Sequence, residues 1–77
     1  MTEEILHKIR VVYGFTQAEI AQYAGVTDSY INQVFKRKRT LSEKVSHRLI
    51  KELNLTPDKL GRILQHYEET VSIRNTI

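Results

Sequence analysis

The segment from residue 17 to residue 35 contains two short helical stretches separated only by Ala24-Gly25-Val26-Thr27. Helices that cross at so short a turn need a small residue at their contact and a residue without Cβ strain in the turn. Ala21 and Gly25 fill these two roles. The apolar residues that can pack on the other side of the crossing are Ile20, Val26, Ile31 and Val34. The segment therefore predicts two short helices in close contact.

Capping signals define where these two helices begin. Thr16 and Glu19 have the spacing of a capping box, and Thr27 can cap the second helix. An apolar residue precedes each cap and can pack against the fourth helical position. We expect a first helix over about 17–24, ended by Gly25. The second should run from Thr27 to about Phe35 and bury Ile31, Val34 and Phe35.

Three further helices are predicted from the same kind of signal. Thr2 can cap a helix that Gly14 ends, Ser42 can cap a fourth, and Thr56-Pro57 opens a fifth. Because 77 residues suffice for only one core, we expect a single all-α domain over 1–77, a compact five-helix bundle. The β-branched stretch at 70–74 could continue the last helix, leave it as a short strand or form an unpacked tail.

Charge is concentrated in one part of the chain. Residues 36–52 hold seven basic side chains against two acidic ones, whereas residues 1–35 hold two basic against four acidic. The basic residues are Lys36, Arg37, Lys38, Arg39, Lys44, Arg48 and Lys51. A localised basic stripe of this kind is typical of a surface that binds a polyanion. A basic face that is only exposed to solvent would have the same composition.

The sequence TQAEIAQYAGVTDSYINQVF closely resembles the helix-turn-helix of the phage repressor and Cro family, the XRE-like or lambda-repressor-like DNA-binding domains. The resemblance extends from about Arg10 to Leu55, and more loosely over the five-helix layout. It implies a lambda-repressor-like bundle that binds double-stranded DNA, with its third helix in the major groove. One departure is the run Lys36-Arg37-Lys38-Arg39, which stands where many members have Glu-x-Gly, so the path of this loop is not predicted.

The resemblance also implies roles for individual residues. The base-reading residues would be Asp28, Ser29, Tyr30, Asn32 and Gln33. The residues on the DNA backbone would be Arg10, Thr16, Gln17, Lys36, Arg37, Lys38, Arg39 and Thr40. Burial of Ile31 and Val34 would by itself turn Ser29, Tyr30 and Gln33 outward, and a side-chain amide can bond adenine. Ordinary exposed polarity is the alternative for each, and Asp28 could instead cap its own helix.

The C-terminal segment carries apolar residues at helical spacing. We expect a dimerisation surface formed by Leu60, Leu64, Tyr67, Val71 and Ile73, with Ile77 in the tail, because repressor-like domains usually dimerise through this end. The alternative is that the same residues belong to the core of one chain.

Several functions are excluded by what the sequence lacks. It has no cysteine, and His7, His47 and His66 are too far apart to supply a metal site, so we expect no metal, no cofactor and no enzymatic activity. No apolar run is long enough for a membrane span, so we expect a cytoplasmic protein that is associated with the bacterial nucleoid when it binds DNA.

Together these features predict a sequence-specific transcriptional regulator, a repressor that acts as a homodimer on an inverted repeat. The alternative is a protein-binding adaptor or antitoxin-like module whose regulatory protein partner matters more than DNA.

Overall fold

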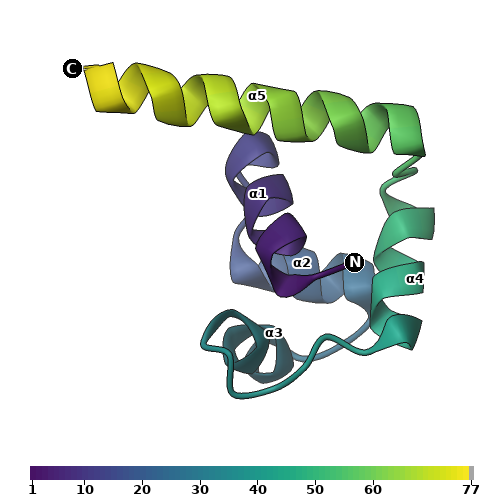
Figure 1. The fold of residues 1–77 in the computed structure, drawn as a ribbon. Helices are drawn as coiled ribbons and strands as arrows, with labels where there is room; N and C mark the ends of the chain where they lie inside the picture. Colours follow the sequence, from purple (N-terminus) through teal and green to yellow (C-terminus); the bar gives the residue numbers. More distant parts are fainter. Residues whose placement is uncertain (77) are drawn as a thin grey trace.

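The computed structural model describes the backbone of residues 1–76 and the side chains of residues 1–74. It contains α1 (Glu3–Tyr13), α2 (Gln17–Ala24), α3 (Asp28–Phe35), α4 (Glu43–Glu52) and α5 (Pro57–Thr76), and no strand over the described residues. The prediction of an all-α five-helix bundle is confirmed (Figure 1). Residues 70–74 are helical, which excludes the strand and the unpacked tail; the tail residue Ile77 lies outside the described residues.

Each helix begins at a hydroxyl that accepts a backbone hydrogen bond from three residues ahead. The predicted caps Thr2, Thr16, Thr27 and Ser42 all do so, at N···O distances of 3.1–3.2 Å. The capping box is complete, because the Thr16 N–H also donates to Glu19 Oε1 at 3.0 Å. Thr56 accepts from the Lys59 N–H at 3.2 Å and so caps α5.

The first four helices end in the same left-handed turn. The turn residues and their φ values are Gly14 (71°), Gly25 (69°), Arg37 (59°) and Asn54 (51°). In each case the next N–H bonds to a carbonyl five residues back, at 2.8–3.0 Å. This is the hydrogen bond of a Schellman cap, in which glycine is the usual turn residue. Arginine is the unusual residue in this set, because its Cβ disfavours positive φ and it lacks the short polar side chain that lets asparagine tolerate this conformation.

Two apolar clusters hold the helices together. The larger cluster connects the four helices α1, α2, α3 and α4. It contains Leu6, Ile20, Ala21, Ala24, Ile31, Val34, Leu41, Val45 and Leu49. The smaller joins α1 to α5 and is built on Ile9, Leu55 and Ile63. The prediction that Phe35 is buried is wrong: Phe35 packs against the larger cluster but stays half-exposed, because it lies at the last position of α3, beside polar side chains of α1.

The arrangement of the helices separates two ends of the molecule. Helix α5 lies across α1, while α2 packs against both α3 and α4 (Figure 1). Figure 1 shows α3 at the opposite end of the bundle from α5, and the C-terminal part of α5 running past α1.

Candidate nucleic-acid interface

The crossing of α2 and α3 has the construction that the sequence predicts. Ala21 and Ala24 are buried at the contact, and Gly25 makes the turn at a φ of 69°. A Cβ added to Gly25 would lie 2.6 Å from the guanidinium carbon of Arg48 on α4. Glycine is therefore favoured here by the left-handed backbone conformation, since the exposed Arg48 side chain could move away from a Cβ, and the crossing fixes which face of α3 is exposed.

The exposed start of α3 carries three of the predicted base-reading residues. Asp28 and Ser29 are exposed, and Gln33 is half-buried one turn further along. The Gln33 amide donates to Ser29 Oγ at 3.4 Å, so these two side chains lie together. The cap of α3 is Thr27, which excludes the alternative that Asp28 is the cap; the Asp28 carboxylate lies in the first turn, where it complements the helix dipole.

Asn32 connects α3 to the start of α2. Its Nδ2 donates to Gln17 Oε1 at 3.1 Å, and the contact is partly buried. Gln17 accepts this bond with its carbonyl oxygen, which leaves its amide N–H groups to donate elsewhere, for example to a phosphate. The pair therefore braces the two helices at the edge of the exposed face.

Tyr30 is turned toward the loop between α3 and α4. Its hydroxyl donates to the Thr40 carbonyl at 3.3 Å and accepts from the Ser42 N–H at 3.1 Å. The guanidinium of Arg39 lies over its ring, 5.0 Å from the centroid. The phenol group is thus engaged within the chain.

The segment 36–40, which we call the basic loop, follows α3 directly, and all five of its residues are exposed. Its path, for which the sequence makes no prediction, begins with Arg37 in the left-handed conformation and ends at Leu41, which is only 7% exposed. Lys36, Arg37, Lys38 and Arg39 therefore lie at the C-terminal end of α3, and Arg39 contacts the ring of Tyr30 on that helix. Four adjacent cations at this place suit contact with phosphates.

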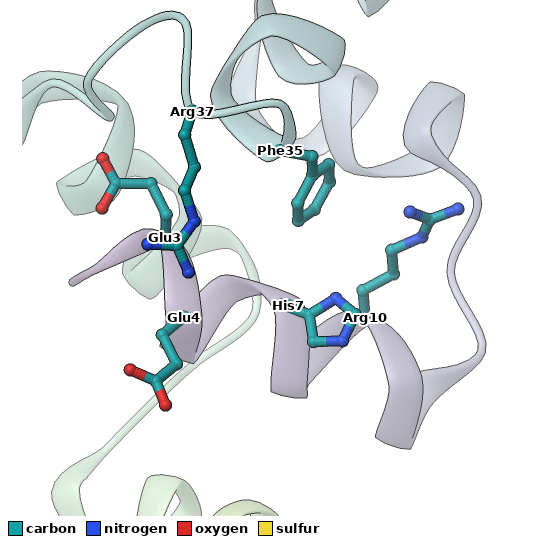
Figure 2. Close-up of a pocket in the computed structure, with 6 residues that line it drawn as sticks. All are labelled: Glu3, Glu4, His7, Arg10, Phe35 and Arg37. Carbon is teal, nitrogen blue, oxygen red and sulfur yellow. The ribbon is translucent and has the colours of Figure 1, made fainter.

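Glu3 on α1 holds the end of the basic loop. Its Oε1 accepts a hydrogen bond from the Leu41 N–H at 3.2 Å. Figure 2 shows the Arg37 side chain extending from the loop toward α1, where Glu3 lies. Hydrogen bonds from its own N–H and from the Leu41 N–H, with the Arg37 charge adding a smaller effect, hold the pKa of Glu3 below its ordinary value. The sequence indicates Glu3 only as a first-turn acid, and no local pattern links it to a residue 38 positions away.

Arg10 links α1 to the start of α2. Its Nε donates to the Phe15 carbonyl at 3.2 Å, and its guanidinium lies 5.2 Å from the centroid of the Phe35 ring. Thr16, the next residue, is exposed but uses its hydroxyl in the capping box. A cavity of about 400 Å³ between α1 and the basic loop is lined by Glu3, Glu4, His7, Arg10, Phe35 and Arg37 (Figure 2).

The predicted dimerisation residues on α5 have different surroundings. Leu60 packs against the smaller core cluster, and Tyr67 contacts α1, with its ring 6.4 Å from that of His7 and 5.4 Å from Lys8 Nζ. Leu64 and Val71 are half-buried. Ile73 is 62% exposed, more than any other large apolar side chain that the structure describes.

The described part of the chain contains neither a metal-binding cluster nor a membrane-spanning helix. Its residues contain no group of three or more potential ligands from His, Cys, Asp and Glu that could hold a metal ion. None of the helices in residues 1–76 combines the length and the apolar character that a membrane span needs.

Comparisons with known proteins bear on this arrangement. Neither the curated proteins nor the solved structures gave a significant match. Residues 6–60, which include α1 to α4 almost entirely, match the helix-turn-helix family of the Cro and repressor type, also called XRE-like. Members of this family bind double-stranded DNA and regulate transcription. The chain belongs to this helix-turn-helix family and is a DNA-binding transcription regulator.

Proposed function

We propose that the chain is a sequence-specific repressor that binds an inverted repeat in double-stranded DNA as a homodimer. The observation that carries the proposal is the exposed face of α3 together with the basic loop that follows this helix and returns to contact Tyr30 through Arg39 and Thr40. One surface thereby offers hydrogen-bonding side chains for bases and cations for phosphates. Specific DNA binding needs both kinds of contact.

Base reading is assigned to the α3 side chains. Ser29 and Gln33 are the strongest candidates, because they lie together on the exposed face and both can donate and accept hydrogen bonds. Asn32 and Asp28 lie at the edges of this face, where Asp28 can accept from a cytosine amino group.

Backbone contacts are assigned to residues that frame α3. Gln17 begins α2, and Arg10 in the last turn of α1 is bonded to Phe15 just before α2; each hydrogen bond leaves N–H groups for phosphate oxygens. The remaining contacts are Thr16 and the basic loop, Lys36, Arg37, Lys38, Arg39 and Thr40.

A homodimer would recognise a longer DNA site than one chain can, and we place the dimer contact on the C-terminal part of α5. One recognition helix covers few base pairs, and two-fold pairing places two helices about 34 Å apart, one turn of DNA. This part of α5 runs past α1 and carries Val71 and the exposed Ile73 (Figure 1). Leu64 and Tyr67 share the face of α5 that carries Val71, whereas Ile73, two positions after Val71, lies on the opposite face of the helix. Leu60 contributes mainly to the core of its own chain.

Selection of bound duplexes from a random DNA library tests the proposal. We expect an enriched inverted repeat whose half-sites are centred about one helical turn apart. Footprinting should then show protection of both half-sites, and sedimentation should show two chains for each repeat. Recovery of sequences without a shared motif would refute specific recognition, and a protected single half-site would refute the dimer.

A further inference from the structure

The end of the basic loop is held by two side chains from different helices. Tyr30 on α3 bonds the Thr40 carbonyl and the Ser42 N–H through its hydroxyl. Glu3 on α1 bonds the N–H of Leu41, the residue between them. Three consecutive backbone positions are therefore fixed by side chains rather than by regular secondary structure.

The same two side chains also face the loop cations. Arg39 lies over the Tyr30 ring, 5.0 Å from its centroid. Arg37 extends toward α1 and lines the same cavity as Glu3 (Figure 2), where its charge acts on the Glu3 carboxylate. Loss of either side chain would therefore release both a piece of loop backbone and the cation beside it.

The engagement of the Tyr30 hydroxyl limits what it can do with DNA. A phenol has one proton to donate, and here that proton is directed to the Thr40 carbonyl. Reading a base as a donor would require this bond to break, and the Ser42 N–H would lose its acceptor if the hydroxyl turned away. These bonds favour a role within the protein over a role at a base edge.

We propose that Tyr30 and Glu3 are positioning residues that hold the basic loop in the conformation in which its cations meet phosphates. The inference rests on the proposed DNA-binding function and assigns to Tyr30 a role different from base reading. A loop that is already ordered loses less conformational entropy on binding, so the effect should appear as affinity for any duplex. Sequence preference should stay with Ser29 and Gln33.

The first variant is Tyr30→Phe in the full chain, which removes only the hydroxyl. We expect affinity for the selected site and for a scrambled duplex to fall together, by about threefold to tenfold, with the ratio between them unchanged. A changed ratio would show that Tyr30 reads a base and would overturn the inference. Unchanged affinity for both duplexes would overturn it as well.

A second comparison uses Glu3→Gln and Glu3→Ala, which both remove the carboxylate charge. Only the glutamine keeps an oxygen that can accept from the Leu41 N–H. We expect Glu3→Gln to bind DNA at least as tightly as the wild type, because a negative charge near phosphates is removed. Glu3→Ala should bind at least threefold more weakly than Glu3→Gln. Equal affinities of the two variants would refute the role of Glu3.

Amide hydrogen exchange of the DNA-free protein gives a readout that does not depend on DNA. Exchange at Ser42 should accelerate in Tyr30→Phe, and exchange at Leu41 should accelerate in Glu3→Ala but not in Glu3→Gln. The amides of Ile31 and Val34 in the core of α3 should remain protected, which shows that the fold is intact. A wild type that binds no duplex would refute the proposed function itself, whereas binding that is insensitive to these variants would refute only the positioning.

Discussion

Replacement of Arg37 by glycine should make the protein more stable and its DNA binding weaker. Arg37 has a φ of 59°, in the left-handed region, where a Cβ costs about 1–2 kcal/mol. Glycine removes this cost, but it also increases the conformational entropy of the unfolded chain, which destabilises the folded state by about 0.4–1 kcal/mol. We therefore expect a net increase of about 0.5–1 kcal/mol in the free energy of unfolding, or about 2–8 °C in Tm for a domain of this size.

Lys36→Gly is the matched control for this substitution. It removes one positive charge from the adjacent position and introduces the same residue, but Lys36 has a φ of −81°, where a Cβ is not strained. Glycine there should lower the free energy of unfolding by about 0.5–1 kcal/mol. The two variants should therefore change stability in opposite directions, although they change net charge equally.

Thermal and urea unfolding at about 0.5 M salt measure both variants while screening the interaction between Arg37 and Glu3. DNA affinity at lower salt should fall for both, because each variant has one cation fewer in the basic loop. An Arg37→Gly protein that melts at or below Lys36→Gly would show that the left-handed backbone at position 37 carries no cost, and the reasoning would fail.

Three further predictions concern the interface. Ser29→Ala and Gln33→Ala should each cost about 1–3 kcal/mol on the selected site and alter base preference, and since their side chains are bonded, the double variant should cost less than the sum of the two. Binding isotherms that keep the wild-type ratio between selected and scrambled DNA would refute this assignment. Joint replacement of Lys36, Lys38 and Arg39 by alanine should weaken both duplexes alike and reduce the slope of log K against log salt by about 0.9 for each phosphate that the variant no longer neutralises; an unchanged slope would place these side chains in solvent. Truncation after Glu69 removes Val71 and Ile73 and should convert dimers to monomers in sedimentation while the melt of the domain changes little; a truncated protein that is still dimeric would refute the α5 contact.

The helices could be predicted because the signals that define them are local. Thr16 and Glu19 are three residues apart, and each bonds the other's backbone within one turn. The exposed face of α3 could be predicted for a similar reason, since burial of Ile31 and Val34 fixes the direction of Ser29. Helical periodicity carries this information without any knowledge of the other helices.

Contacts between distant segments could not be predicted in this way. Periodicity places Tyr30 on the outer side of α3, but its hydroxyl finds partners 10 and 12 residues later, in a loop without a periodic pattern. The apolar side chain of Phe35 predicts a place in the core, yet the end of α3 leaves one side of its ring to Arg10. Such contacts depend on how the loop and α1 pack, which residue types do not specify by themselves.

Arg37 is the position where local preference and structure disagree most clearly. Four helices end in the same left-handed turn, and three of these turns use the residues that tolerate it best, two glycines and one asparagine. The fourth, at the end of the helix that faces DNA in our proposal, uses arginine although glycine would relieve the backbone. Conflicts of this kind concentrate where function requires a particular side chain. Because the strained residue brings a cation to the basic loop and to Glu3, the cost in stability is best explained by a requirement for charge at this place.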